Sequence, residues 1–187
     1  MNIIGITGTL GSGKGTIVDY LIKEKGYTHY SVRAFIAEEI TKRGMEVNRD
    51  TLTSVANDMR ANHSPSYIID MLYQRAHEAG HDAVIESIRS LGEIAALRAK
   101  DSFYLFAVDA DQRARYQRIK QRSSETDHID FETFKMNEER EMSNTDPNKQ
   151  NLSGCIAQAD FVFRNDGTVE ELYNSVEEVL KTINSNR

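Results

Sequence analysis

The sequence predicts an α/β fold of three layers, in which helices cover both faces of a central five-stranded parallel sheet. Five short stretches have the composition of strands: 3–7, 28–32, 83–88, 103–109 and 160–165. Several of them are continuous apolar runs, which is typical of parallel strands buried on both faces. Helical patterns lie between the strands, as right-handed crossovers require. Ligands of such sheets bind at the carboxyl ends of the strands, so the residues that follow each strand are the functional candidates.

Several helical patterns begin with recognisable start signals. Ser64, which precedes a proline, predicts a cap with proline at the first helical position. Ser90 with Glu93, and Thr168 with Glu171, have the spacing of capping boxes. After Thr168, one helical face is apolar and is formed by Val169, Leu172, Val176, Val179, Leu180 and Ile183.

Length and composition predict a single domain, residues 1–187, in the cytoplasm. A chain of 187 residues with 39% hydrophobic and 28% charged residues can bury one substantial core. The formal net charge of −6 disfavours broad binding to nucleic acid. The single cysteine, Cys155, excludes an internal disulfide framework, and no apolar run predicts a membrane partner. Composition does not predict the oligomeric state.

The stretch GTLGSGKGT, residues 8–16, predicts a phosphate-binding loop between the first strand and a helix over 14–25. Its spacing is G-x-x-x-x-G-K, in which glycines let backbone amides wrap a phosphate and the lysine bridges the β- and γ-phosphates. We therefore expect ATP to contact Gly8, Gly11, Ser12, Gly13, Lys14, Gly15 and Thr16. Gly15 stands where a hydroxyl residue usually binds magnesium, so Mg²⁺ requires either Thr16 or waters held by a carboxylate elsewhere.

The ending GSGKGT resembles that of adenylate kinase and related nucleoside monophosphate kinases, which also have glycine after the lysine. The segment VIESIRSLGEI, 84–94, is similar to the strand-and-arginine segment of small P-loop nucleotide kinases. RNDGTVEEL, 164–172, resembles the adenine-contacting loop of dephospho-CoA kinases and phage deoxynucleotide kinases. The order of these pieces also suits a group of archaeal adenylate-kinase-like proteins. The resemblance covers most of the chain and implies a P-loop NTPase fold of the nucleoside monophosphate kinase type, with Asn165 and Gly167 near the adenine.

The third strand ends in Glu86 and Ser87, where the resembling kinases have aspartate and glycine. Glu86 is expected to order the waters around Mg²⁺ or to orient the acceptor, although a strand-end acid can simply cap a turn. Arg89 follows three residues later and is expected to clamp the acceptor phosphate. A solvated loop arginine is the alternative.

The resemblance also implies a helical insertion at about 33–80 that binds the acceptor. SVRAFIAEEITKRG, 31–44, fits its first helix, but Ala37 stands where a phosphate-binding arginine is expected. Arg33 or Arg60 is the candidate replacement. Arginines at such positions are more often surface charges than ligands.

A lid is expected at about 113–145, after the fourth strand. Arg115, Arg118 and Arg122 share one helical face. The resemblance implies that such a face stabilises the transferring phosphoryl group, so Arg118 and Arg122 join Lys14 as catalytic candidates. An exposed basic stripe is the alternative.

Four further residues are assigned no catalytic role. His77 and His81 have the spacing of a metal pair, but a glycine between them is expected to end their helix, and no third ligand is near. We expect both to be surface histidines and Cys155 to be a buried thiol. Arg140 lies among glutamates and is expected to form salt bridges rather than return to the phosphates.

Two classes of function fit these residues. The first is an ATP- and Mg²⁺-dependent kinase whose acceptor is a small phosphorylated molecule, a nucleoside or deoxynucleoside monophosphate or, as an alternative, dephospho-CoA. The second is a regulatory switch that binds ATP and hydrolyses it slowly. The arginine face and the insertion favour the kinase.

Overall fold

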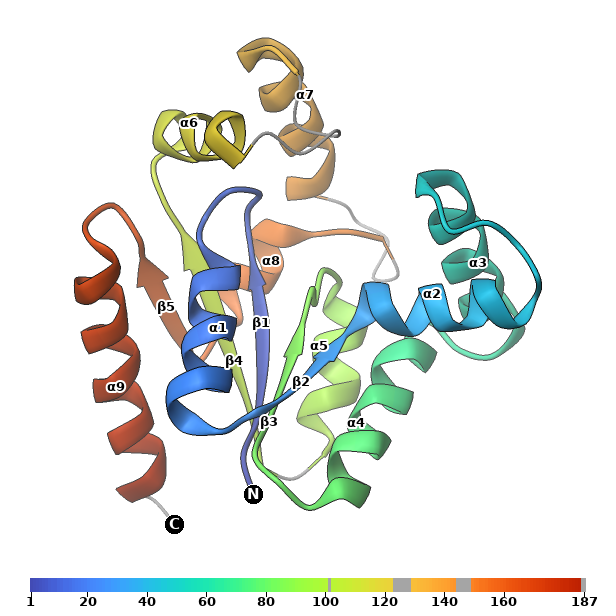
Figure 1. The fold of residues 1–187 in the computed structure, drawn as a ribbon, viewed down its shortest axis with the longest axis horizontal. Coiled ribbons are helices and arrows are strands. Elements are labelled where there is room, and N and C mark those ends of the chain that lie inside the picture. Colours follow the sequence, from blue (N-terminus) through green and yellow to red (C-terminus); the bar gives the residue numbers. More distant parts are fainter. Residues whose placement is uncertain (101, 123–128, 144–148, 186–187) are drawn as a thin grey trace.

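The computed structural model describes residues 1–100, 102–122, 129–143 and 149–185, and its centre is a five-stranded parallel sheet (Figure 1). The strand order is β2-β3-β1-β4-β5, and every adjacent pair is parallel. The strands are β1 (Ile3–Gly8), β2 (Thr28–Ser31), β3 (Ala83–Glu86), β4 (Phe103–Asp109) and β5 (Phe161–Arg164). All five predicted strands are therefore confirmed, and so is the fold class.

Helices connect the strands and cover both faces of the sheet. In chain order they are α1 (Lys14–Lys25), α2 (Val32–Lys42), α3 (Arg49–Asn62), α4 (Tyr67–Ala79), α5 (Leu91–Arg98), α6 (Gln112–Arg122), α7 (Phe131–Met142), α8 (Leu152–Ala157) and α9 (Val169–Ser185). The predicted helix over 14–25 is confirmed as α1. Among the described residues, none of these helices has the length and apolar character needed to span a membrane.

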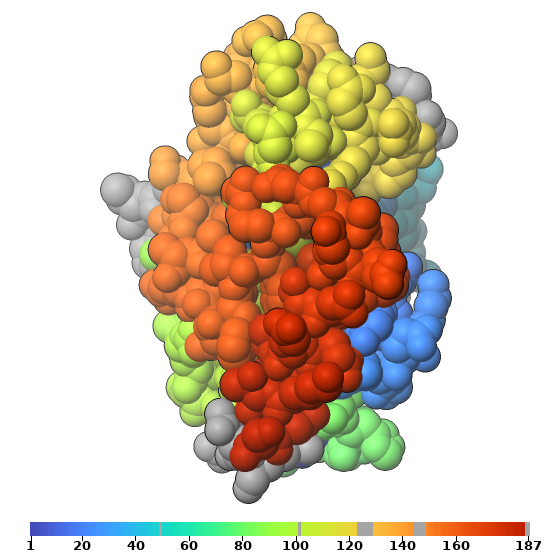
Figure 2. All heavy atoms as spheres, turned by 90° about the vertical axis from the view of Figure 1, so that its left-hand side faces the viewer, coloured from blue at the N-terminus to red at the C-terminus, as the bar shows by residue number. Residues whose placement is uncertain are grey.

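Two apolar cores lie on opposite faces of the sheet and make the three layers. One core joins the strands to α1 and α9, through residues such as Ile17, Leu21 and Val176. The other joins them to α2, α4, α5 and α8, through residues such as Ile69 and Leu97. Figure 2 shows α9 covering one side of the molecule, with α6 and α7 above it. Helices α6 and α7 therefore stand over the sheet's carboxyl edge rather than on either face.

The third strand is shorter than the predicted range 83–88 because Ser87 has a φ of 70°. A left-handed residue leaves the extended conformation that strand pairing requires. The second strand likewise stops at Ser31, whose hydroxyl accepts a hydrogen bond from Ala34 N and caps α2. Both endings fall at the carboxyl edge, where ligands of parallel sheets bind.

Two capping boxes are confirmed, and the cap at Ser64 is displaced. Ser90 caps α5 together with Glu93, and Glu171 bonds back to Thr168 at the start of α9. Helix α4 instead begins at Tyr67 with Ser66 as its cap residue, because the carbonyl of Ser64 accepts from Tyr67 N in a preceding turn.

The apolar face of α9 is confirmed except at its first residue. Leu172, Val176, Leu180 and Ile183 are buried against the sheet, and Val179 packs beside them. Val169, at the start of the helix, is 53% exposed. Periodicity places residues on a face but does not say where the sheet beneath that face ends.

Candidate functional site

The loop between β1 and α1 takes its shape from three glycines with positive φ. Gly8, Gly11 and Gly13 have φ values of 137°, 77° and 100°. A side chain at Gly8 would collide with the carbonyl oxygen of Val108, and one at Gly11 would collide with a carbonyl of α6. The loop therefore requires glycine at these positions both for backbone freedom and for close approach.

The loop delivers the chain to α1 with the helix N-terminus open. Gly13 is the cap residue and provides no side-chain hydrogen bond, and the first turn of α1 carries no acidic residue. Nothing lies within 4 Å of the position that a Cβ on Gly15 would occupy. The uncapped amides and the positive end of the helix dipole make this a suitable site for an anion.

Lys14 folds back over the loop. Its Nζ donates to the carbonyls of Gly8 and Thr9, at 2.9 and 2.7 Å. Burial, followed by the positive charge of Arg89, lowers the pKa of Lys14 from 10.5 to about 8. An amine with this pKa gains protonation when a polyanion binds beside it.

Asn165 connects the loop to helix α6. Its Nδ2 donates to Ser12 O at 2.8 Å, and its backbone carbonyl accepts from Nη2 of Arg118 at 2.7 Å. Asn165 is buried. The side-chain amide nitrogen of Asn165, a residue expected near the adenine, is thus bonded to the loop. Gly167 lies in the following turn, where a Cβ would collide with the Glu171 carboxylate that caps α9. Adenine contact at both positions stays a prediction.

Two buried polar atoms flank Asn165 without a hydrogen-bond partner in the described part of the chain. They are the Oγ of Ser12 and the Nη1 of Arg118. Leaving a buried polar atom unpaired costs about 1–3 kcal/mol, so such atoms in a native structure call for a partner. Ser12 lies in the phosphate loop and Arg118 on α6, and Asn165 bonds both residues.

Arg115 and Arg122, which share the predicted helical face with Arg118, have surroundings different from those of Arg118. The Arg115 side chain is buried and bonds Glu138 of α7 bidentately, with distances of 2.6 and 2.9 Å. It also donates to Leu10 O in the loop and to Ala110 O. Its donors are thus committed to the protein, whereas Arg122 is exposed. Sequence spacing missed this role because the partner lies on a different helix.

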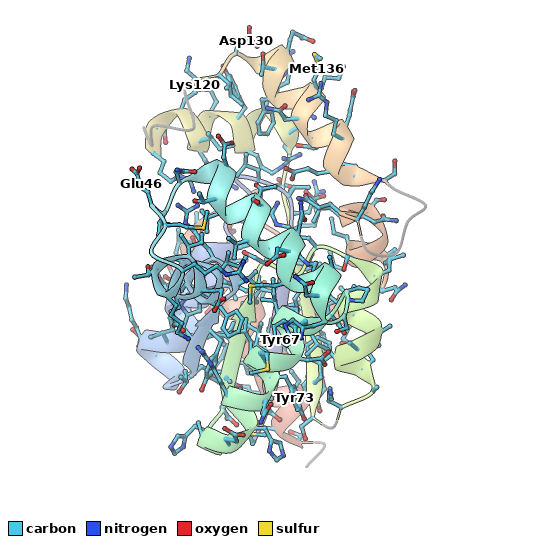
Figure 3. All side chains as sticks on the ribbon, turned by 90° about the vertical axis from the view of Figure 1, so that its right-hand side faces the viewer. Glu46, Tyr67, Tyr73, Lys120, Asp130 and Met136 are labelled. Carbon is cyan, nitrogen blue, oxygen red and sulfur yellow. The ribbon has the colours of Figure 1, made fainter. Side chains whose placement is uncertain are left out.

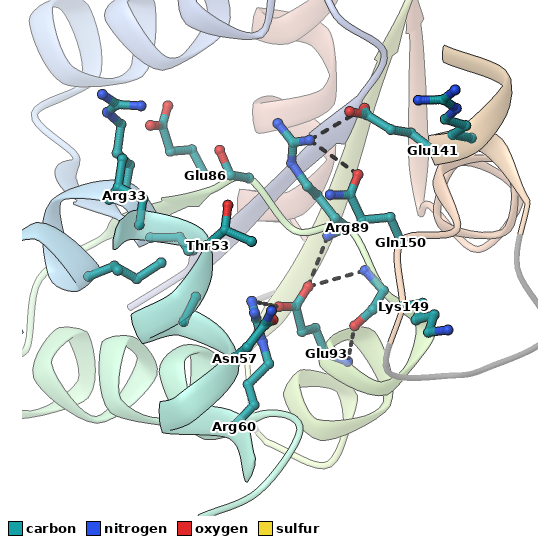
Figure 4. Close-up of a pocket in the computed structure, with 17 residues that line it drawn as sticks. Arg33, Thr53, Asn57, Arg60, Glu86, Arg89, Glu93, Glu141, Lys149 and Gln150 are labelled. Atoms are coloured by element: carbon teal, nitrogen blue, oxygen red, sulfur yellow. Dashed lines mark hydrogen bonds and ion pairs between the residues drawn. The ribbon is translucent and has the colours of Figure 1, made fainter. Parts of the chain in front are cut away.

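A pocket of about 720 Å³ opens beside the loop, between α2, α3 and the residues after β3 (Figure 4). Val32, Ile36, Leu52 and Ala56 form an apolar wall on α2 and α3. Figure 3 shows this side of the molecule, with α3 in front, Tyr67 and Tyr73 of α4 below it and Met136 of α7 above. The charged lining residues are Arg33, Arg60, Arg89, Arg140, Lys149, Glu86, Glu93 and Glu141.

The predicted acceptor arginines are brought together in this pocket, but their charges are not equally available. Arg60 lies 3.6 Å from Glu93, a buried carboxylate whose other oxygen accepts from the backbone amides of Arg89 and Ser90. Arg33 is exposed and forms no ion pair with any described residue. Which of the two replaces the arginine missing at Ala37 stays a prediction.

Glu86 lines the same pocket and is held toward β2. Its Oε2 lies 3.5 Å from His29 Nε2, and its Oε1 accepts from Ser31 Oγ at 3.2 Å. The hydrogen bond from His29 lowers the pKa of Glu86, which keeps the carboxylate ionised. Ser87 also lines the pocket and holds the left-handed conformation that suits the glycine found there in resembling kinases. Such strain in a non-glycine residue is concentrated at functional sites.

The protein side chains at the site fit Mg²⁺ only if phosphate oxygens of the nucleotide provide some of its ligands. Among the described residues, no group of three or more His, Cys, Asp or Glu side chains could hold a metal. Mg²⁺ typically keeps several waters and binds one or two protein groups together with substrate phosphates. Glu86 and Thr16 could supply those groups, and their role stays a prediction.

Comparison with known proteins identifies the family. A family model described as an AAA domain matches residues 4–158. The chain belongs to this family.

Relatives of this AAA domain protein match along the whole chain. A UPF0200 protein of Thermococcus gammatolerans is 27% identical over 187 residues, covering 97% of this chain and 95% of the relative. A UPF0200 protein of Pyrobaculum aerophilum is 28% identical over 182 residues, covering 96% and 97%. These names state no activity.

Solved structures show that the AAA domain protein has the fold of P-loop kinases. TT1252 from Thermus thermophilus has a TM-score of 0.63 at 23% identity and covers 97% of both chains. A gluconokinase from Sinorhizobium meliloti has a TM-score of 0.60 at 14% identity, covering 99% of this chain and 94% of its own. A shikimate kinase from Bacteroides thetaiotaomicron has a TM-score of 0.58 at 11% identity, covering 96% of this chain and 98% of its own.

The two histidines and the cysteine of the AAA domain protein lie where the sequence predicts them. Helix α4 ends at Ala79 with Gly80 in the left-handed conformation, and both His77 and His81 are exposed. Cys155 is buried, and burial raises the pKa of its thiol to about 12. A thiol with this pKa is not a nucleophile near neutral pH.

The loop geometry predicts opposite effects for two glycine substitutions. Gly8→Ala should lower the free energy of unfolding by about 2 kcal/mol or more, because the new Cβ meets Val108 O in a conformation that only glycine adopts easily. Gly15→Ala should raise it by up to about 1 kcal/mol, because the site is open and helical. Urea unfolding of both variants measures the difference. Equal effects would contradict this account of the loop.

The lowered pKa of Lys14 predicts that ATP binding takes up a proton at pH 8. A bound triphosphate stabilises the ammonium form, so affinity should be greatest below pH 8 and fall as the pH rises past it. Calorimetry at pH 8 in two buffers of different ionisation enthalpy detects the uptake. Lys14→Arg is the control, since arginine does not titrate in this range. Affinity of the wild type that is constant from pH 7 to about 9.5 would refute the assignment.

Proposed function

We propose that this P-loop kinase-like protein transfers the γ-phosphoryl group of ATP to a small, phosphate-bearing acceptor, with nucleoside and deoxynucleoside monophosphates as the favoured class. The observation that carries the proposal is the pocket beside the phosphate loop. It combines Arg33, which has no carboxylate partner among the described residues, with Arg89 and with an apolar wall. Two cations suit an acceptor phosphate, and the wall suits a base.

The donor side is assigned to the loop and to α6. Loop amides and Lys14 would hold the β- and γ-phosphates, with the adenine near Asn165 and Gly167. Arg118 has an unpaired buried nitrogen and is linked to the loop through Asn165, which supports its role at the transferring group. Arg122 would approach from the same helix. Bound Mg²⁺ would neutralise phosphate charge in the transition state.

The acceptor side is assigned to the insertion at about 33–80. The wall residues of α2 and α3 would receive the base, and the side chains of Thr53 and Asn57, which also line the pocket, would meet its polar edge. An oxygen of the acceptor phosphate attacks the γ-phosphorus, and the bond from that phosphorus to the β,γ-bridging oxygen breaks. ADP leaves with the electron pair. Positioning and charge neutralisation supply the catalysis.

Helices α6 and α7 would act as the lid expected at about 113–145. They stand over the carboxyl edge of the sheet and contact the loop through Arg115. A lid in this place excludes water, so that the acceptor rather than water receives the phosphoryl group.

The test is ADP formation by the pure protein with ATP, Mg²⁺ and a panel of acceptors. Nucleoside monophosphates, deoxynucleoside monophosphates and dephospho-CoA form three arms, and ATP alone is the fourth. Turnover that depends on a monophosphate supports the proposal, and turnover only with dephospho-CoA transfers it to the alternative acceptor. ADP formation at the same rate in every arm would indicate a hydrolysing switch. Lys14→Ala should abolish transfer, since it removes the cation at the γ-phosphate.

The acceptor assignment predicts a selective effect of Arg89→Ala. A charge-assisted hydrogen bond contributes about 1.5–3 kcal/mol, so the acceptor KM should rise by about one to two orders of magnitude. ATP affinity, measured by calorimetry, should change little because Lys14 and the loop hold the donor. Arg98→Ala is the matched control, since this arginine pairs with Asp160 outside the pocket. Loss of ATP binding with an unchanged acceptor KM would move Arg89 to the donor site.

A further inference from the structure

Helix α7 carries two carboxylates that pair with arginines of two different segments. Glu138 and Glu141 are three residues apart and so share one face of the helix. Glu138 pairs with Arg115 of α6, and Glu141 pairs with Arg89 in the pocket. One helix therefore contacts an arginine on the donor side and another on the acceptor side.

The pair on the donor side is the anchor. Arg115 and Glu138 form two bonds of 2.6 and 2.9 Å, and their side chains are only 4% and 12% exposed. Arg115 also donates to Leu10 O, so this pair fixes α7 to the loop. A buried bidentate pair is costly to break, because either partner alone would be left as a buried charge.

The pair on the acceptor side is weak by comparison. Glu141 accepts one bond from Arg89 Nη1 at 3.4 Å, and the two side chains are 36% and 40% exposed. Gln150 accepts a second long bond from the same nitrogen, also at 3.4 Å. Figure 4 shows Arg89 extended toward both side chains, away from Glu93. An exposed single contact of this length holds the guanidinium in place and yields to a better ligand.

We infer that Glu141 occupies the place of the acceptor's phosphate at Arg89 and selects for acceptors that carry a dianion. The inference rests on the proposed function, because it takes Arg89 as the acceptor's anchor. A phosphate dianion offers Arg89 a second charge and short bidentate bonds, which displace one long bond to a carboxylate. An uncharged acceptor offers neither and leaves Glu141 in place. The bound dianion then repels Glu141, while Glu138 keeps the helix attached to the loop.

The inference is tested by phosphate binding, which needs no knowledge of the acceptor. The protein is saturated with magnesium and ADP to fill the donor site, and inorganic phosphate is titrated by calorimetry at pH 7.5. Glu141→Gln should tighten phosphate binding about two- to fivefold, the range that an exposed ion pair contributes. Glu139→Gln is the matched control: it removes the same charge from the same helix, outside the pocket, and should leave binding unchanged.

Arg89→Ala separates binding at this site from binding elsewhere. In that background Glu141→Gln should give no further gain, because the two residues act on the same contact. The inference is overturned if the Glu141→Gln protein binds phosphate no more tightly than the wild type, or not measurably. It is also overturned if Glu139→Gln has an equal effect on phosphate binding, or if the gain from Glu141→Gln persists in the Arg89→Ala background. Kinase turnover is measured separately. An inactive acceptor panel with the expected phosphate binding would refute the transfer reaction, and with it acceptor selection, and leave Glu141 as the residue that a bound phosphate displaces from Arg89.

Discussion

The close approach of three distant segments to the loop after β1 is the constraint on which the site depends. The carbonyl of Val108 at the end of β4, the carbonyl of Arg115 in α6 and the amide of Asn165 after β5 each occupy the space that a side chain on Gly8, Gly11 or Gly13 would fill. The glycines let the backbone turn, and these neighbours determine where it turns. The loop has its shape only when β4, β5 and α6 are in place.

The same contacts link the loop to the charges around it. Asn165 bonds both Ser12 and Arg118, so the end of β5 sets the distance between the loop and the guanidinium of α6. Arg115 bonds Leu10 and Glu138, so the loop and helix α7 are held by one side chain. These bonds are short and partly or fully buried, so their geometry is set more firmly than that of the longer contacts that line the pocket.

The pocket has a different character from the loop. Most of its cations and carboxylates are at least partly exposed, and the described contacts between them are long, such as the 3.4 Å bond from Arg89 to Glu141 and the 3.6 Å pair of Arg60 and Glu93. A firmly held loop beside a pocket that can rearrange suits the proposed phosphoryl transfer, in which the acceptor would enter, displace water and leave in each cycle.

The sequence by itself determined the strands, the helix after the loop and the phosphate-binding motif, because each depends on local order. Apolar runs mark strands buried on both faces, and the glycine spacing at Gly8 and Gly13 is a local demand of the backbone. The tertiary structure alone decided which arginines are available. Arg115, Arg118 and Arg122 are equivalent by helical spacing, but Glu138 neutralises the first, Asn165 orients the second, and the third is exposed. The partner of a charge lies wherever the fold brings a carboxylate, and no spacing along one helix records it.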